Sequence, residues 1–284
     1  MEKNKIFVSS SCFKTRKLED IIDICERNEI LNLEISGNIK YIPLTKLIDI
    51  FQKYKHFNFR FHNYFPIPRV PFVINLAHPA VVKKSLNNIS KGINLSKDYG
   101  GDIFSIHSGF LINPKENSLG QIQSHYKDIT LNEALNNLEN SFIKLSKLKN
   151  NTILCIENNV VEKYNLNKKK NRYIFSDLSD KEFINKLITK FEIRVLLDLA
   201  HLKVSSKTLG FNSSEFIDEY MEKTKIIHLS ENNGLVDQNL PLKKNSWFWN
   251  KINWKSLDYV SLEIKNCTIN ELKDQIKLTS DRVL

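Results

Sequence analysis

The sequence predicts an α/β fold, a single (β/α)8 TIM barrel that takes up residues 1–284 as one domain. Three observations support this: eight short apolar runs, stretches with helical spacing between most of them, and a length typical of one-domain barrels. The chain has 284 residues, of which 41% are hydrophobic, enough to bury one large core. Apolar runs that alternate with helical patterns indicate βαβ units and a parallel sheet.

The apolar runs give the expected strands, and the amphipathic stretches give the expected helices. The strands are expected at residues 5–10, 31–36, 57–62, 102–107, 152–157, 194–199, 225–230 and 259–264. The helices are expected at residues 17–28, 44–54, 81–97, 131–148, 180–191 and 213–223. Thr130 is the expected N-cap of one helix, and Ser213 or Ser214 of another.

Glycine usage favours a closed barrel over an open nucleotide-binding sheet. The chain contains no GxGxxG or GxxxxGK[ST] motif, and it has only 8 glycines. Such glycine-rich turns are what cradle phosphates in the open doubly wound sheets. The sequence therefore has little phosphate-binding loop to offer.

Charge, cysteine usage and hydropathy limit the class of protein. The formal charge is +10, but the lysines are spread along the chain, which favours a solvated surface over a nucleic-acid partner. The four cysteines show no CxxC spacing, so we expect reduced thiols and no thiolate zinc site. No 18-residue apolar segment occurs, and the short apolar stretch near the start lacks a small-residue cleavage site. We expect a soluble, cytoplasmic protein without membrane contact.

Polar residues occur where nearly every apolar run ends. In a parallel barrel the C-terminal ends of the strands carry the chemistry. A lone Asp there is more often a cap, and a lone His is more often a hydrogen-bonded core residue, but a full set in one register favours a common site. The set comprises Glu34, His62, His107, Glu157, Asp198, His201, His228 and Glu263.

The acidic members of this set point to a metal. An ionised carboxylate inside a buried strand costs several kcal/mol unless it is paired or bound to a cation. Glu157, Asp198 and Glu263 would repel one another at one end of the barrel, and a divalent cation would relieve that repulsion. With the imidazole of His228 the donor set suits manganese, cobalt, zinc or magnesium.

The remaining histidines and the tryptophans fit structural roles better. His56 and His125 stand in polar segments, where surface positions are expected. His78 precedes a proline and a helix start, which favours a local capping or packing role. Trp247, Trp249 and Trp254 follow the seventh strand, where packing is favoured over stacking on a sugar.

Several motifs resemble those of one known family in order and spacing. They are KLEDIIDICERNEILNLEISGN, LCIEN, LLDLAH, IIHLSENNG with VDQNLP, and VSLEI. Together they resemble the xylose isomerase-like barrels, which include sugar and sugar-phosphate isomerases and epimerases and the endonuclease IV-type abasic-site endonucleases. The resemblance covers nearly the whole chain and implies that Glu157, Asp198, His228 and Glu263 bind a divalent metal.

The resemblance also assigns three histidines to the substrate site. His201 matches a position that contacts substrate in the epimerases and a further metal in the endonucleases. The stretches FHNYFPIPRVPFVINLAHP and FSIHSG resemble the endonuclease branch, in which residues matching His62 and His107 bind an additional zinc. We therefore expect His201, His62 and His107 to bind substrate, with His62 and His107 as candidates for a second metal.

The implied activity is a metal-dependent sugar or sugar-phosphate isomerase or epimerase of carbohydrate metabolism, with Glu157 and Glu263 exchanging a proton with an enediolate. The alternative is an endonuclease IV-like phosphodiester hydrolase that acts on abasic DNA. Where the endonucleases have Asp-x-His, this chain has Asp237, Gln238 and Asn239, so the histidine of a third metal is missing. A barrel that keeps the site as a binding module is a third reading. The particular sugar and the oligomeric state stay open.

Overall fold

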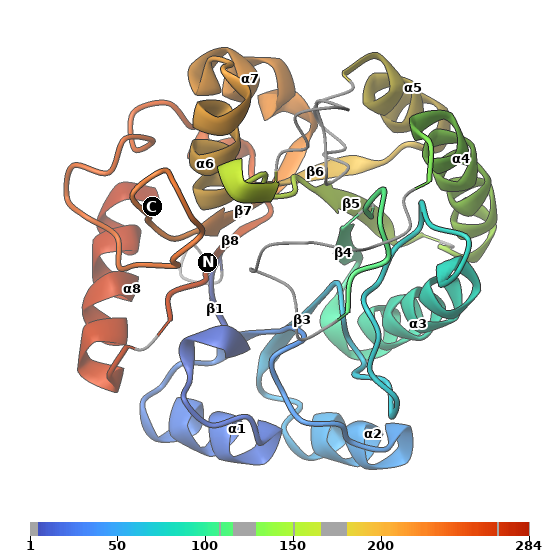
Figure 1. The fold of residues 1–284 in the computed structure, drawn as a ribbon. Helices are drawn as coiled ribbons and strands as arrows, with labels where there is room; N and C mark the ends of the chain where they lie inside the picture. The colour runs from blue at the N-terminus through green and yellow to red at the C-terminus, as the bar shows by residue number, and fades with distance from the viewer. Residues whose placement is uncertain are drawn as a thin grey trace.

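The strands form a closed barrel in which each strand pairs in parallel with the next along the chain, and β8 pairs with β1 (Figure 1). The computed structural model describes residues 5–107, 109–115, 129–149, 151–165, 181–265 and 267–283. The strands are β1 (Ile6–Ser9), β2 (Asn32–Ile35), β3 (Asn58–His62), β4 (Ile103–His107), β5 (Ile153–Glu157), β6 (Arg194–Asp198), β7 (Thr224–Leu229) and β8 (Tyr259–Leu262). The predicted (β/α)8 barrel is confirmed, and each strand overlaps the run that predicted it.

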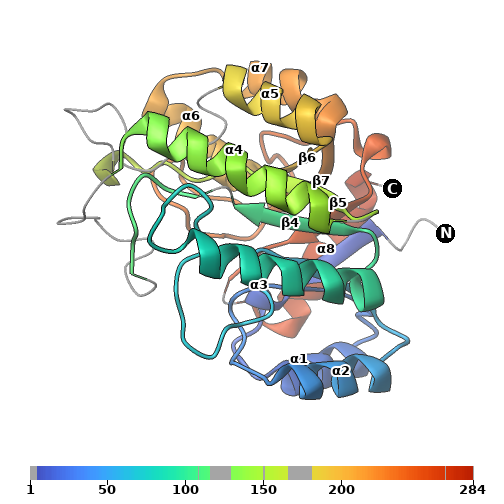
Figure 2. The same cartoon turned by 90° about the vertical axis from the view of Figure 1, so that its right-hand side faces the viewer.

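The helices form a ring outside the strands, as the two views at right angles show (Figures 1 and 2). They are α1 (Leu18–Arg27), α2 (Leu44–Lys53), α3 (Val82–Leu95), α4 (Leu131–Leu148), α5 (Lys181–Phe191), α6 (Leu199–Leu209), α7 (Ser213–Tyr220) and α8 (Ile269–Val283). Short 3-10 or π turns are η2 (Ser10–Cys12), η3 (Ser96–Gly100), η5 (Lys163–Asn165), η7 (Met221–Lys223) and η8 (Trp254–Ser256).

Capping side chains fix the starts of two helices. Thr130 and Glu133 form a capping box at α4, as expected for Thr130. At α7 the expectation is corrected by one or two residues, because Asn212 is the cap: its side chain accepts a hydrogen bond of 2.9 Å from the backbone N–H of Ser214. Asparagine is as good an N-cap as serine, so both kinds of residue give the same signal in sequence.

Helices α6 and α8 are not among those expected from the sequence. Helix α6 buries residues all around its axis, so it lacks the polar face by which a helix is recognised. The residues at its two ends are nevertheless typical of a helix. Asp198 caps the start of α6. Gly210, at φ 76°, ends it in the left-handed conformation that suits glycine. Helix α8 is strongly polar and has few buried residues, so its apolar stripe is narrow.

The barrel interior consists of an apolar layer with a polar layer above it. The apolar layer is Phe7, Ile103, Cys155, Leu196, Ile226 and Tyr259. Side chains two residues apart on a strand share a face. The next inward positions toward the C-terminal ends are therefore polar: Ser9, Ser105, Glu157, Asp198, His228 and Ser261, which are all buried. The polar layer lies at the mouth of the barrel, where the sequence predicted the site.

The expectations about cysteines and membrane segments can also be compared with the structure. Cys12, Cys25, Cys155 and Cys267 are buried and free of disulfides, as expected. Within the ranges that the structure describes, no helix combines the length and the apolar character that crossing a bilayer requires.

Candidate metal centre

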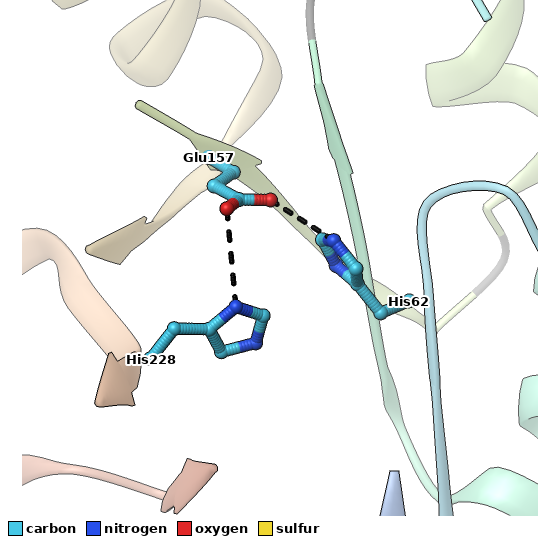
Figure 3. A group of neighbouring side chains, drawn as sticks. All are labelled: His62, Glu157 and His228. Atoms are coloured by element: carbon cyan, nitrogen blue, oxygen red, sulfur yellow. Dashed lines mark ion pairs between the residues drawn. The ribbon is translucent and has the colours of Figure 1, made fainter. Parts of the chain in front are cut away.

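Glu157 lies at the centre of the polar residues at the barrel mouth. Its Oε2 atom is 3.0 Å from Nε2 of His62 and 3.1 Å from Nε2 of His107. Its Oε1 atom is 3.4 Å from Nδ1 of His201 and 3.8 Å from Nδ1 of His228. Figure 3 shows the two carboxylate oxygens of Glu157 directed at different imidazoles, one at His62 and the other at His228. The structure thus gathers four of the predicted histidines around one buried carboxylate.

His228 links Glu157 to two further carboxylates. Its Nδ1 atom is 3.5 Å from Oε2 of Glu263, whose other oxygen accepts a hydrogen bond of 3.2 Å from the hydroxyl of Ser9. Its Nε2 atom, on the opposite edge of the ring, is 3.0 Å from Oε1 of Glu34. Both edges of this fully buried imidazole therefore face carboxylate oxygens.

Asp198 lies beside this group and is fixed by the backbone. Its Oδ1 atom accepts a hydrogen bond of 2.7 Å from the backbone N–H of His201 and so caps α6. The side chain of Asn158 bonds both the N–H and the C=O of Asp198, at 2.7 and 2.9 Å. Oδ2 of Asp198 is left at 3.9 Å from Nδ1 of His201. One carboxylate oxygen is thus committed to the helix, and the other is available to a ligand.

The neighbouring charges shift the pKa values of the acidic groups in opposite directions. Burial raises the pKa of Glu157, but the imidazoles of His107 and His62 outweigh burial and lower it well below its usual value. Burial likewise raises the pKa of Glu263, and His228 outweighs it, which brings the value to about 2. For Asp198 burial prevails over the nearby imidazole and raises the pKa to about 7. Two of the three acids are therefore ionised at neutral pH, and the third titrates near it.

The imidazoles are shifted by the same competition. Burial lowers the pKa of His107 to about 4, despite the carboxylate of Glu157, so this ring is neutral at pH 7. Burial also lowers the pKa of His62, His201 and His228, but for these rings the adjacent carboxylates outweigh it and the net shift is upward. His62, His201 and His228 are therefore stabilised in their charged form by the carboxylates next to them, whereas His107 is not.

The donor set fits a divalent cation. Among the described residues, three groups bring ligand atoms within 4.8 Å of one another: His62, Glu157 and His228; Glu34, His228 and Glu263; Glu157, Asp198 and His201. Several of these atoms are buried without a hydrogen bond among the described residues, including Oε2 of Glu157, Oδ2 of Asp198 and Nδ1 of His228. A buried polar atom without a hydrogen bond is costly, and a cation bound by mixed oxygen and nitrogen donors would satisfy these atoms.

Comparison with known proteins found similarity at the level of structure. No protein-family model and no curated protein matches the chain in sequence. A D-tagatose 3-epimerase-like protein matches 99% of this chain over 100% of its own length, with 17% identity and a TM-score of 0.68. Endonuclease IV from Thermus thermophilus matches 98% of this chain over 98% of its own, with 12% identity and a TM-score of 0.59.

A third solved structure is also similar to this chain over nearly its whole length. The xylose isomerase domain protein from Planctomyces limnophilus matches 98% of this chain over 96% of its own, with 11% identity and a TM-score of 0.58. The chain has the xylose isomerase-like barrel fold. Several of the other similar structures are sugar epimerases. Identities this low establish only that the fold is shared. Activity and substrate must be inferred from the residues of the site.

Three residues in or next to the site of this xylose isomerase-like barrel had no assigned role from sequence. Glu34 was noted as a strand end, and Tyr259 lies four residues before Glu263, on the same face of the strand by the two-residue alternation. Asp237 lies with Oδ2 at 3.6 Å from Nε2 of His201, and its backbone N–H donates a 3.0 Å hydrogen bond to Glu162. Asp237 follows β7 in an irregular loop, so no periodic pattern could have placed it.

The residues expected outside the site behave as predicted where the structure describes them. His56 is exposed and lies 2.9 Å from Glu26. Nδ1 of His78 accepts a 3.2 Å hydrogen bond from the backbone N–H of Ala80, a local capping role. Trp249 is buried in the hydrophobic core, and Trp247 and Trp254 pack against that core, which agrees with the expected packing role. His125 lies outside the described residues.

Proposed function

We propose that the protein is a divalent-metal-dependent sugar or sugar-phosphate isomerase or epimerase that works through an enediolate. The observation that carries the proposal is that Glu157 and Glu263 approach the same atom, Nδ1 of His228, at 3.8 and 3.5 Å. Two carboxylates from separate strand ends thus flank one point at the barrel mouth. The transfer of a proton from one face of a carbon chain to the other requires an acid–base group on each face.

The metal would be held by Glu157, Asp198, His228 and Glu263. Each has a buried ligand atom or a contact to another member of the set. When bound, a divalent metal supplies a positive charge that polarises a carbonyl and acidifies the C–H bond next to it. Manganese, cobalt, zinc and magnesium all suit this mixture of carboxylate and imidazole donors.

The carboxylates of Glu157 and Glu263 would remove and return the proton of the substrate. Glu263 has a side chain 15% exposed and Glu157 one of 1%, so Glu263 is the more accessible to substrate at the mouth. Their lowered pKa values keep both carboxylates in the basic form at neutral pH. In the proposal one glutamate removes a proton next to the carbonyl, and the other returns one to the enediolate. His201, His62 and His107 would bind substrate hydroxyl groups through their ring nitrogens.

Hydrogen exchange tests this proposal without knowledge of the natural substrate. The metal-loaded protein is incubated in D₂O with a panel of ketoses, aldoses and their phosphates, and deuterium at the carbon next to the carbonyl is followed by NMR. Glu157→Gln and Glu263→Gln should each abolish incorporation. Glu26→Gln, at the exposed pair with His56, should leave it unchanged. Near-normal incorporation in either of the first two variants would reject the assignment.

A second candidate function is hydrolysis of the phosphodiester bond at abasic DNA. It is favoured by one observation: His62 and His107 both lie next to the same oxygen of Glu157, at 3.0 and 3.1 Å, which places two imidazoles beside one carboxylate as candidate ligands of a further metal. The formal charge of +10 agrees with a polyanionic substrate. Cleavage of an abasic duplex that weakens with added salt would support this activity over the sugar reaction.

A further inference from the structure

We propose that Glu34 and Tyr259 are positioning residues, which hold His228 in the orientation and protonation that direct its Nδ1 atom at the metal. This inference rests on the metal site of the proposed function. It concerns how the site is built, and neither residue contacts substrate in it.

The three residues form a chain of contacts inside the barrel. The hydroxyl of Tyr259 on β8 donates a hydrogen bond of 2.9 Å to Oε2 of Glu34 on β2. The other oxygen of Glu34 lies 3.0 Å from Nε2 of His228 on β7. Glu34 and His228 are fully buried, and Tyr259 is 1% exposed. Water therefore does not compete for these groups, which makes each contact strongly directional.

The two edges of the His228 ring face different surroundings. The Nε2 edge faces Glu34 and, behind it, the floor of the barrel, where the ring of Tyr259 lies 4.9 Å from that of Phe7. The Nδ1 edge faces Glu157 and Glu263, and the Glu263 side chain is the most exposed of the three carboxylates around this ring. The Nδ1 edge is thus the side that an ion can reach from the mouth.

Glu34 determines which nitrogen of the His228 ring has a lone pair available to a metal. A neutral imidazole has one N–H and one lone pair, and only the lone pair binds a metal. A carboxylate 3.0 Å from Nε2 favours a proton there, which leaves the lone pair on Nδ1. Metal-binding histidines commonly have such a carboxylate at the second nitrogen, which also makes the ligand more basic.

Tyr259 keeps Glu34 from becoming a ligand itself. Glu34, His228 and Glu263 also have ligand atoms within 4.8 Å of one another, so an alternative site on the Nε2 edge is conceivable by distance alone. The hydroxyl of Tyr259 occupies one oxygen of Glu34 and fixes the carboxylate plane. The ring of Tyr259 contacts both Phe7, at 4.9 Å between ring centroids, and the guanidinium of Arg60, whose Cζ lies 5.6 Å from the centroid of the Tyr259 ring.

Metal titration of substitution variants tests the positioning role. Binding of Co²⁺ and Zn²⁺ is measured by visible absorption and by calorimetry, in the absence of any sugar. Glu34→Gln keeps the size of the side chain but removes its charge, and we expect an affinity about 10- to 100-fold lower. Tyr259→Phe, which keeps the ring packed on Phe7, should lower it several-fold. Tyr54→Phe, which removes a tyrosine hydroxyl bonded to Asp23 outside the barrel, is the matched control and should bind as wild type does.

Nitrogen NMR of the wild-type protein provides a second readout that needs no variant. In the zinc-loaded protein, Nε2 of His228 should carry a proton, and Nδ1 should show the shift of a metal ligand. Zinc on Nε2, or an unchanged affinity in Glu34→Gln, would overturn the inference. These results differ from failure of the proposed function, in which the wild-type protein would bind metal through Nδ1 of His228 but incorporate no deuterium into any sugar of the panel.

Discussion

The imidazole of His62 on β3 lies 3.0 Å from the carboxylate of Glu157 on β5, although β4 separates the two strands in the barrel (Figure 3). The contact spans the mouth because both residues occupy inward positions at the C-terminal ends of their strands. In a closed barrel such positions converge, so residues 95 positions apart in sequence share one site. The properties of the site therefore depend on this convergence around Glu157.

Replacement of Glu157 by glutamine should lower the pKa of His62. Burial alone lowers that pKa, and the charge of Glu157 is the largest contribution in the opposite direction. In the metal-free Glu157→Gln protein the pKa of His62 should therefore fall below the ordinary histidine value of about 6.5. NMR titration of the imidazole C–H signals measures it. Glu26→Gln should leave His62 unchanged, and an unshifted His62 in Glu157→Gln would contradict the central place of this carboxylate.

The number of metal ions bound near His107 separates the two candidate functions. Because burial brings the pKa of His107 to about 4, the ring is neutral at pH 7 and can bind a metal without losing a proton. The hydrolase predicts two zinc equivalents per chain in excess zinc and one in His107→Asn, whereas the isomerase predicts one in both proteins, measured by elemental analysis after gel filtration. His56→Asn, at an exposed histidine, is the control and should bind as much zinc as wild type does. Equal stoichiometry in wild type and His107→Asn would exclude a second ion at this histidine.

Asp198→Asn should stabilise the metal-free protein at neutral and alkaline pH. The folded pKa of Asp198 is raised to about 7, so the folded state retains a proton that the unfolded chain has lost between about pH 4 and 7. Wild-type stability should therefore fall as pH rises through this window, and the variant should lack that component. Asparagine can still cap α6. We expect a gain of about 1–3 kcal/mol at pH 8 and almost none at pH 4.

Urea unfolding at several pH values measures this difference. The control is Asp258→Asn, at a partly exposed pair 3.3 Å from Lys225, which should change the free energy of unfolding only slightly. The same Asp198→Asn substitution should greatly weaken metal binding. A variant that is less stable than wild type at pH 8 would show that Asp198 is not a destabilising buried charge in the metal-free protein.

Metal should raise the melting temperature. A ligand that binds only the folded state at 100 times its dissociation constant stabilises by about 2.7 kcal/mol, which corresponds to roughly 5–10 °C for a chain of this size. We expect EDTA treatment to lower the melting temperature by this order and added Zn²⁺ or Mn²⁺ to restore it. Glu157→Gln should show no response to metal. A wild-type melting temperature insensitive to both EDTA and metal would contradict a site formed by the native fold.

Much of the fold could be predicted from the sequence because strand and helix periods were distinct. The inward polar ends of β5 to β7 stand two residues beyond buried apolar ones, as in Cys155 and Glu157 or Leu196 and Asp198. The eight apolar runs with helical stretches between them predicted the barrel, and the polar residues at the ends of the runs predicted the edge that carries the site. Helix α6 was not predicted because its buried residues leave no polar face.

The composition of the site was harder to predict than its place. His62, His107, His201 and His228 were recognised because each stands at or just beyond a strand end. Glu34 had the same signal, but only the structure shows that it faces His228 and accepts a hydrogen bond from Tyr259. Asp237 belongs to an irregular loop, and its approach to His201 depends on tertiary contacts that no local pattern reports.

Elemental analysis of the purified protein tests the central claim most directly, because the account requires a divalent metal at the barrel mouth. The measurement is made on the wild-type protein and on Glu157→Gln, prepared together and saturated with Zn²⁺ or Mn²⁺ before gel filtration. We predict at least one tightly bound ion per wild-type chain and none in Glu157→Gln. A folded wild-type protein that retains no divalent metal, or a variant that retains as much as wild type, would contradict the account.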